Sequence, residues 1–343
     1  MTIAESQPQV SRILLDGHGG DQAPNMVLDA AKMIVDSEKN IHLGVVGQPD
    51  ILAPALEQRG LSDRVTLIPA SQIIDMSEAP AMALRRKKDS SMHVASRLLQ
   101  DGSWDAFVSA GNTGALMAIP RLILRTVQGV DRPAIASKIP DMHGGYSLML
   151  DAGANVDCSA SHLLQFASMG SSYMHTAAAI KKPRVGLLNI GSESIKGTDV
   201  IKLAAKQLEA SNLNFIGNVE GTDIFSGNVD VIVCDGFVGN VALKTLEGTA
   251  KFMVHQLKKN IMSSLSAKVG MVFAKKAMNR FKDSMDPGRY NGAPLLGLNG
   301  IVVKSHGSAD AKSYVSAIMA AHCEASVHLV DEIAQSMVEW VDE

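Results

Sequence analysis

Five loops in the sequence carry residue types that are suited to binding anions. They read DGHGGD at residues 16–21, SAGNTG at 109–114, DAGANVD at 151–157, NIGSESIKG at 189–197 and DGFVGN at 235–240. Glycine lets a backbone approach a ligand closely, and the first turn of a helix offers unpaired N–H groups to an anion. One such loop alone is more typical of a tight turn between a strand and a helix. Their recurrence favours a site for phosphate or for an oxyanion.

The loop at 109–114 supplies side-chain donors as well as backbone. Ser109, Asn112 and Thr113 precede an apolar helical stretch at residues 115–124, in which Pro120 is expected to cause a kink beyond the first turn. The alternative is that Asn112 or Thr113 is only a helix N-cap. The other candidates for phosphate or substrate binding lie in two more of these loops: Asp16, Gly19, Gly20, Asp21, Asp235 and Gly236.

Standard nucleotide and hydrolase motifs are absent from the sequence. The pattern GxxxxGK[ST] of P-loop hydrolases does not occur, and the glycines at 17–20 have the wrong spacing for the dinucleotide pattern GxGxxG. The nucleophile elbow GxSxG and the zinc motif HExxH are missing too. The residues alone therefore indicate an anion-binding enzyme without a nucleotide motif.

Short apolar runs that alternate with amphipathic stretches must position these loops. We expect buried strands at residues 13–15, 43–46, 65–68, 106–109, 148–150, 185–190 and 229–234. Most of them precede a glycine-containing turn and then a helix, which predicts a mainly parallel sheet flanked by helices. Ligands of such sheets bind at the carboxyl ends of the strands, so we expect the five loops to share one edge.

The composition is that of a globular protein. Of the 343 residues, 46% are hydrophobic and 20% are charged. A net charge of -3 and an aromatic content of 4% argue against nucleic-acid binding. Three separate cysteines without a CxxC pair fit reduced thiols, and no targeting or membrane-spanning segment is recognised, so a cytoplasmic protein is expected. We expect residues 1–10 to be a flexible tail and 11–343 to form a single α/β domain.

Seven stretches, in order, resemble the phosphate acyltransferases of fatty acid and phospholipid synthesis. They read LLDGHGGDQAP at 14–24, IIDMSEAPAMALRRKKDSSM at 73–92, SAGNTGALM at 109–117, LDAGANVDC at 150–158, LLNIGSESIKGTD at 187–199, VDVIVCDGFVGNVALKTLEG at 229–248 and YNGAPLLGLNGIVVKSHGSAD at 290–310. The resemblance extends over almost the whole chain, from about residue 12 to about residue 335. One departure is His18, where family members often carry Met, so a side-chain role for His18 is in doubt.

This resemblance implies both a fold and an activity. The fold is Rossmann-like, related to phosphotransacetylase and to decarboxylating dehydrogenases such as isocitrate dehydrogenase. The activity is transfer of a fatty acyl group from acyl carrier protein to inorganic phosphate. The implied partners are acyl carrier protein, a second copy of the chain, and a membrane glycerol-3-phosphate acyltransferase that accepts the product. We expect neither a cofactor nor a metal.

Three residues are the predicted catalytic groups. Lys196, in a loop between a strand and a helix, is suited to neutralise phosphate or the developing oxyanion, and Asn240 to donate its amide to the thioester carbonyl. The resemblance favours these roles over a solvated lysine and a helix cap. His306 is a candidate proton donor to the leaving thiolate, with a structural loop histidine as the alternative. Ser109 as an acyl nucleophile is the rival chemistry, which lacks a local base.

A basic, apolar segment at 249–284 differs from the rest of the chain. Eight Lys or Arg and no Asp or Glu lie between residues 249 and 282, and apolar residues recur there at helical spacing. We expect a helix, a break near Gly270, and a second helix that ends by Pro287. This amphipathic arm is expected either to form a subunit contact or to touch anionic lipid or the acyl chain; the family's peripheral membrane association supports the second.

Other interpretations stay open on the sequence alone. The basic run at residues 85–88 is either a solvated face or a contact for an acidic carrier protein. The main rival enzyme is a phosphotransacetylase-like protein that uses acyl-CoA. A nicotinamide-dependent decarboxylating dehydrogenase and a non-catalytic scaffold at a lipid surface are weaker alternatives.

Overall fold

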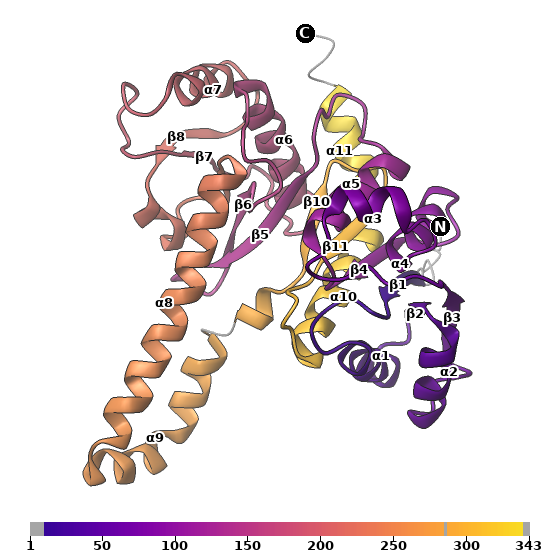
Figure 1. Ribbon diagram of the computed structural model, residues 1–343. Coiled ribbons are helices and arrows are strands. Elements are labelled where there is room, and N and C mark those ends of the chain that lie inside the picture. The colour runs from indigo at the N-terminus through magenta and orange to yellow at the C-terminus, as the bar shows by residue number, and fades with distance from the viewer. Residues whose placement is uncertain (1–9, 285–286, 339–343) are drawn as a thin grey trace, which may run out of the picture.

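The computed structural model describes residues 10–284 and 287–338, and its centre is one twisted sheet. Eleven strands follow the order β3-β2-β1-β4-β11-β10-β5-β6-β9-β7-β8. Helices cover both faces, and a pair of helices projects from the body (Figure 1). Most neighbouring strands are parallel, which confirms the predicted α/β fold.

The structure contains all seven predicted strands and four more. The predicted ones are β1 (Ser11–Asp16), β2 (Ile41–Gly47), β3 (Val65–Pro69), β4 (Ala106–Ser109), β6 (Tyr146–Leu150), β7 (Val185–Leu188) and β9 (Val231–Val233). The additional ones are β5 (Ala134–Pro140), β8 (Phe215–Val219), β10 (Ala293–Leu296) and β11 (Ile301–Lys304). β5 contains Lys138 and Pro140, and β10 contains only four residues, so neither gives a clear strand pattern.

Strand direction reverses across the middle of the sheet. β10 is antiparallel to β11 and to β5, and β5 is antiparallel to β6. After three reversals, β6, β9, β7 and β8 run opposite to β3, β2, β1, β4 and β11. The loops after β1 and β4 therefore leave one end of the strands, and those after β6, β7 and β9 leave the other. The expectation that all five loops share one edge is wrong, because it assumed one uninterrupted parallel sheet.

In the first half of the sheet, helices cover both faces of strands that are apolar on both sides. Ile13 and Leu15 of β1 pack with α1 and α10, whereas Leu14 packs with α4 and α5 on the other face. This two-sided burial explains the uninterrupted apolar run in β1. The helices of this half are α1 (Asn25–Ser37), α2 (Pro49–Gln58), α3 (Pro80–Arg86), α4 (Ser91–Gln100), α5 (Thr113–Leu124) and α10 (Ala311–Ser326).

The second half has a different set of covering helices. Leu148 and Leu150 of β6 pack with one layer of helices, and Met149 lies in a smaller cluster against which Ala242 and Leu246 of α8 pack. The helices of this half are α6 (Ala160–Thr176), α7 (Asp199–Glu209), η1 (Gly221–Phe225), α8 (Gly236–Met262) and α11 (Leu329–Val338). Leu243, also on α8, packs against the apolar cluster of the first half. The root of α8 therefore contacts both halves.

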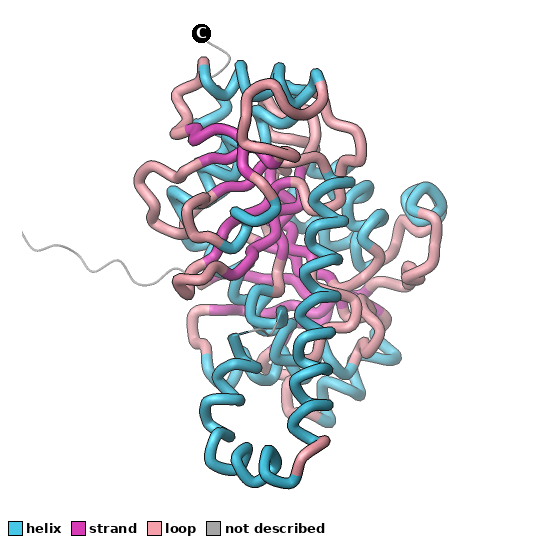
Figure 2. Tube along the Cα trace, turned by 90° about the vertical axis from the view of Figure 1, so that its left-hand side faces the viewer, coloured by secondary structure: helices cyan, strands magenta, loops and turns pink. Residues whose placement is uncertain are grey.

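The predicted arm consists of the outer part of α8 and of α9 (Leu265–Ser284), which lie side by side (Figure 2). The 3-10 turn η2 (Pro287–Tyr290) then leads back to the sheet. The break between the helices falls at residues 263–264, and Gly270 lies within α9, so the predicted position of the break is wrong. The hydroxyl of Ser263 donates to the Asn260 carbonyl at 2.7 Å. Serine hydroxyls that compete for backbone groups favour helix ends, whereas one glycine inside a helix costs only about 1 kcal/mol.

Candidate active site

The loops after β1, β4 and β11 form a first cluster around the buried carboxylate of Asp16. The hydroxyls of Ser91 and Ser109 each donate to it at 2.7 Å, and the backbone N–H of His18 donates at 3.3 Å. Asp16 therefore orients two hydroxyls and one N–H, the role in which an acidic residue is compatible with a nearby anion. Ser109 is fully buried, and its oxygen also accepts the Gly111 N–H at 3.0 Å.

Glycines let the loops of this cluster come together. A Cβ on Gly19 would lie 2.7 Å from a carboxylate oxygen of Asp16 and 2.9 Å from the backbone N of Gly111. Gly20 has a φ of 103°, which only glycine adopts readily. The neighbouring Asp21 is exposed, and its N–H donates to the Gly307 carbonyl in the loop after β11 at 2.8 Å.

Asn112 has both ends of its side chain engaged within the protein. Its Oδ1 accepts the Ala115 N–H at 3.0 Å, so Asn112 is the N-cap of α5. Its Nδ2 donates to carbonyl oxygens of the 75–78 segment at distances from 2.9 to 3.2 Å. This geometry matches the capping alternative and ties the 75–78 segment to α5. Thr113, the first residue of α5, is exposed.

The end of β11 and the loop after it contribute two basic side chains, Lys304 and His306. The sequence predicted a role for His306 and not for Lys304. Lys304 is the last residue of β11, in register with Ser109, and is half-buried. Burial lowers the pKa of Lys304 to about 8. The signal available in the sequence was a lysine at the end of the β-branched run Ile-Val-Val, directly before the predicted His306.

His306 lies where this loop meets α8. Its Nδ1 accepts the Ser308 N–H at 3.3 Å, which places the proton of the neutral ring on Nε2. Nε2 lies 4.0 Å from Oε2 of Glu247 on α8. Partial burial lowers the pKa of His306, with Lys244, Lys304 and Lys251 adding to the effect and Glu247 opposing it.

The loops after β6 and β9 form a second cluster around Asp151. Its carboxylate is fully buried and accepts N–H groups of Ile135, Ala154 and Asn155 at 2.6 to 3.1 Å. Burial nevertheless raises the pKa of Asp151. A Cβ on Gly239 would lie 1.9 Å from the Asp151 carbonyl oxygen, so the first turn of α8 packs directly on this loop.

Asn240 lies in the second cluster and is not a helix cap. Asp235 is the N-cap of α8, because its Oδ1 accepts the Val238 N–H at 2.8 Å. Gly236 is buried, and a Cβ there would lie 2.8 Å from the Asn155 backbone. Asn240 is exposed on the following turn, and its side chain lies beside Gly153, at which a Cβ would be in ordinary contact with it at 3.4 to 3.5 Å. The amide is therefore available to a ligand.

Lys196 has no described contact with either cluster, although its loop leaves the same end of the sheet as the loops after β6 and β9. It is exposed in the loop between β7 and α7, as predicted, and its ammonium has no hydrogen-bond or ion-pair partner among the described residues. The Asn189 amide donates to the Lys196 carbonyl at 3.3 Å and shapes this loop. None of the interactions that the structure describes brings Lys196 to Asn240 or to His306.

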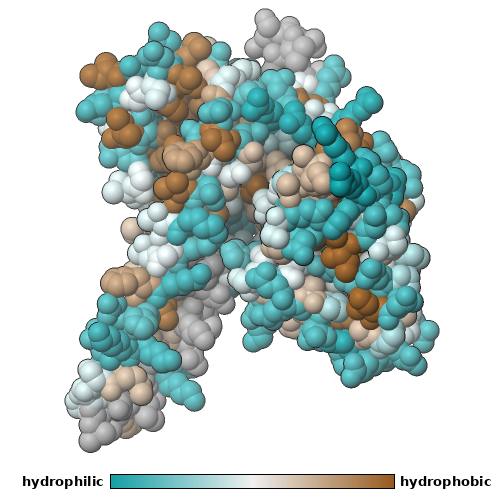
Figure 3. All heavy atoms as spheres, in the orientation of Figure 1, coloured by the Kyte–Doolittle hydropathy of each residue, from teal (hydrophilic) through white to brown (hydrophobic). Residues whose placement is uncertain are grey.

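The two clusters are close because the middle strands are short. Ala293 at the start of β10 pairs with Lys304, and Leu296 at its end pairs with Ala134 of β5, beside the end of β6. Three strand steps span about 10 Å. Asn240, Lys244 and Glu247 have the spacing of one helix face, and α8 covers a similar distance of about 10 Å from Asn240 to Glu247. The surface is hollowed between the two halves near the root of the arm (Figure 3).

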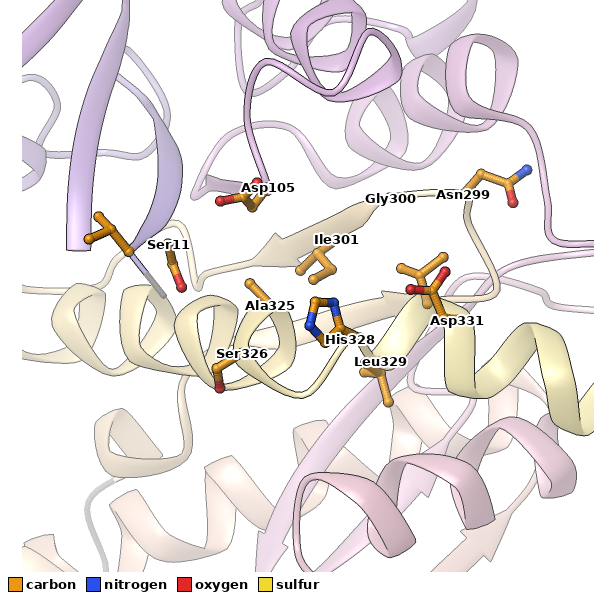
Figure 4. A pocket seen from close by; sticks show the side chains of 12 residues that line it. Ser11, Asp105, Asn299, Gly300, Ile301, Ala325, Ser326, His328, Leu329 and Asp331 are labelled. Carbon is orange, nitrogen blue, oxygen red and sulfur yellow. The ribbon is translucent and has the colours of Figure 1, made fainter. Parts of the chain in front are cut away.

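A separate cavity lies away from this site. It measures about 220 Å³ and is lined by residues at the starts of β1 and β11 and at the turn between α10 and α11, including Ser11, Ile301 and His328 (Figure 4). The glycine-rich loops of the first cluster follow the other ends of β1, β4 and β11, and no described residue of either cluster lines this cavity.

Neither a metal site nor a membrane span is found in the described part of the chain. No three His, Cys, Asp or Glu side chains gather there in a way that would hold a metal ion. No helix in residues 10–284 or 287–338 is both long and apolar enough to cross a membrane.

Comparisons with known proteins agree with this architecture. A phosphate acyltransferase from Magnetococcus marinus is 49% identical over 90% of this chain and 89% of its own length. One from Nitrosococcus oceani is 48% identical over 96% of this chain and 98% of its own. The structure of a phosphotransacetylase from Streptococcus pyogenes has the same fold, with a TM-score of 0.60 over 92% of this chain and 94% of that one at 16% identity. The family model described as "Fatty acid synthesis protein" matches residues 11–329, and the chain belongs to that family.

Proposed function

We propose that this protein transfers a fatty acyl group from acyl-acyl carrier protein to inorganic phosphate and releases an acyl phosphate for phospholipid synthesis. Family membership makes the chain an acyltransferase, and relatives named phosphate acyltransferase support phosphate as the acceptor. The observation that carries the proposal is the face of α8 that joins the free amide of Asn240 to the cationic groups around His306. One side of the site is thus suited to a carbonyl and the other to a phosphate.

The proposed reaction is a direct attack. An oxygen of phosphate forms a bond to the thioester carbonyl carbon, the carbonyl oxygen becomes an oxyanion, and the C–S bond then breaks to release the thiolate. Asn240 donates an N–H to the oxyanion, and Lys196 supplies positive charge after its loop approaches the site. His306 relays the proton: its neutral ring accepts the proton that hydrogen phosphate loses on attack, and the imidazolium so formed protonates the departing thiolate.

Direct attack is preferred because the alternative nucleophiles are poorly placed. Ser109 is fully buried and donates to Asp16. Burial raises the pKa of the Cys158 thiol to about 11 and that of Cys234 well above its usual value, so neither provides a thiolate near neutral pH. An acyl-enzyme intermediate is unnecessary when the second substrate is itself a nucleophile.

The decisive experiment incubates the protein with a long-chain acyl-acyl carrier protein, with and without phosphate. We expect acyl phosphate and free carrier thiol to appear in equal amounts only when phosphate is present. Faster turnover with acyl-CoA would instead identify a phosphotransacetylase-like enzyme. Intact mass after incubation with acyl carrier protein alone should show no acyl adduct, and an adduct that phosphate discharges would overturn direct attack.

The proposed partners follow from the same function. We propose a cytoplasmic homodimer that associates peripherally with anionic membrane, where a membrane glycerol-3-phosphate acyltransferase takes up the acyl phosphate. The arm supports one or both contacts, because Phe252 is 61% exposed and Phe273 is 86% exposed on a segment rich in lysine. The exposed basic residues Arg85, Arg86 and Lys88 offer a contact for an acidic carrier protein.

A further inference from the structure

Lys304 holds a half-buried positive charge without a negative partner. It ends β11, between the loop after β4 and the short strand β10. Its ammonium donates to the carbonyl oxygen of the adjacent Ser305, and no carboxylate among the described residues lies within ion-pair distance. Asp16, whose charge acts on Lys304, already accepts two hydroxyls. Burying a charge without a counter-ion is unfavourable, so an unpaired lysine of this kind marks a candidate ligand site.

Further cationic groups face Lys304 across the site. Lys244 of α8 is close enough to lower the pKa of Lys304, while Asp16 and Asp21 act in the opposite direction. Lys244 is itself paired with Glu247 at 2.9 Å, and Glu247 also approaches His306. Positive groups thus converge on the loop after β11 from β11 and from α8.

The loops after β1 and β11 also carry backbone N–H groups without an acceptor among the described residues. A Cβ on Gly20 would lie 3.1 Å from the Gly307 carbonyl oxygen, so the loops after β1 and β11 touch at these glycines. The Asp21 N–H is used in this contact. The N–H groups of Gly20 and Gly307 have no acceptor within the described ranges. Gly307 follows Lys304 by three residues and Gly20 lies on the loop that contacts Gly307, so two N–H groups with no described acceptor are available near the end of β11 to a phosphate oxyanion.

We propose that Lys304, with Lys244 of α8 and the N–H groups of Gly20 and Gly307, binds a phosphate-class anion. This subsite deepens the proposed acyl transfer and rests on it for its role: the anion is either inorganic phosphate or the phosphodiester of the pantetheine group that carries the thioester. Asn240 precedes Lys244 of the subsite by about one turn of α8, roughly 6 Å along the helix, a distance that a pantetheine arm or a bound acyl donor can bridge. Lys304 is then a substrate-binding residue, and its counter-ion is the substrate.

The first test measures anion binding without any acyl donor, so it does not depend on turnover. The probes are inorganic phosphate and 4′-phosphopantetheine, and the readout is the increase in melting temperature with probe concentration. We expect at least one probe to stabilise the wild type and Lys312→Met, a matched control that removes an exposed lysine from α10. Lys304→Met should lose this response, and Lys304→Arg should keep most of it. Equal stabilisation of Lys304→Met and the wild type, or no response to either probe in the wild type, overturns the proposal.

Kinetics identify which anion binds. Lys304→Met should raise a KM at least about tenfold, the effect of losing one charged contact. A rise in the KM for phosphate alone assigns the subsite to inorganic phosphate. A rise in the KM for acyl-carrier protein, but not for acyl-pantetheine without the phosphate, assigns it to the phosphodiester. Unchanged KM values for both substrates contradict the proposal. If the wild type forms no acyl phosphate, the proposed function fails while the melting experiment still decides the anion site.

The melting experiment also shows whether Lys304→Met folds normally. Because a half-buried, unpaired ammonium destabilises the folded state, Lys304→Met without ligand should melt at the wild-type temperature or above it. If Lys304 instead stabilised the fold, Lys304→Met would melt below the wild type. Lys304→Met could melt below the wild type while Lys304→Arg still responds normally to the probe. In that case Lys244→Met becomes the test variant, and it should also bind the probe more weakly. An unaltered response in Lys244→Met would then contradict the proposal.

Discussion

The imidazole of His306 meets the carboxylate of Glu247, with Nε2 and Oε2 4.0 Å apart. His306 belongs to the loop after β11, in the first half of the sheet, whereas Glu247 belongs to α8, which begins after β9 in the second half. This contact joins two groups of strands that run in opposite directions. It places the candidate proton donor against α8, about two turns after Asn240 on the same helix.

Replacing Lys196 tests its proposed electrostatic role. Lys196→Ala should lower kcat by about tenfold to a hundredfold, because preorganised charge at the transition state contributes a few kcal/mol. The melting temperature should not change, since the exposed ammonium has no partner within the described residues. Lys202→Ala, a control on α7 that removes a half-buried lysine with a long 3.9 Å pair to Asp199, should retain normal turnover. A folded Lys196→Ala enzyme of normal turnover removes Lys196 from the mechanism.

Asn240 and Asp235 should show separate defects. Asn240→Ala should mainly lower kcat, because the amide is exposed and does not cap α8. Asp235→Ala removes the N-cap acceptor of the Val238 N–H and should cost about 1 kcal/mol of stability. Turnover and thermal melting of both variants would be compared. A purely thermal defect in Asn240→Ala would mean that the amide supports structure and not the oxyanion.

The close contact at Gly239 predicts a steric defect. Gly239→Ala places a Cβ 1.9 Å from the Asp151 carbonyl oxygen, so α8 must move away from the loop after β6. We expect a loss of about 1–3 kcal/mol and reduced turnover, since Asn240 moves with the helix. Gly248→Ala is the control: a Cβ there meets nothing within 4 Å, and alanine should stabilise the helix by about 0.5–1 kcal/mol. Urea unfolding of both variants measures the difference, and equal stability would contradict this packing.

The pKa of Lys304 predicts a pH dependence of phosphate binding. Burial lowers the pKa to about 8, with Lys244 adding to the effect and Asp16 and Asp21 opposing it. The ammonium is therefore present below pH 8 and is lost as the pH rises through that value. The KM for the anion bound at Lys304 should increase by about tenfold for each pH unit well above 8. In Lys304→Arg the guanidinium keeps its proton, so the rise should disappear; a rise of the same size in that variant would assign it to another group.

The arm distinguishes lipid binding from dimerisation. Replacing Phe252 and Phe273 with Glu should detach the protein from anionic vesicles and leave turnover on soluble substrate largely intact, if the arm binds lipid. Binding of the wild type to anionic vesicles should then exceed its binding to neutral vesicles, and it should weaken as the salt concentration rises. If the two residues instead form a subunit contact, light scattering should give the double variant half the molecular mass of the wild type. Equal binding to both kinds of vesicle, or none, contradicts the lipid interpretation.

Local sequence determined the elements and many of the loops. Apolar runs such as Ile13–Leu15 specify strands through burial on both faces, and glycines at 19 and 20 specify loops in which a side chain would clash. The family was also recognisable from the sequence, and the match over residues 11–329 confirms it. The catalytic roles of Lys196, Asn240 and His306 stay predictions, because the structure gives their positions and not their chemistry.

Only the tertiary structure decided how these loops meet. The short strands β10 and β5 carry weak local signals, yet they reverse the strand direction and put the loops of the two halves at opposite ends of the sheet. Tertiary packing also determined that Asn112 caps α5, that Asp235 and not Asn240 caps α8, and that Lys304 is an unpaired, half-buried cation. Strand pairing, burial and charge depend on residues distant in the chain: Lys304 acquires its lowered pKa from burial in the folded protein and from the charge of Lys244, 60 residues earlier. Periodicity along the chain records which residues are buried, but it does not record the neighbours against which they are buried.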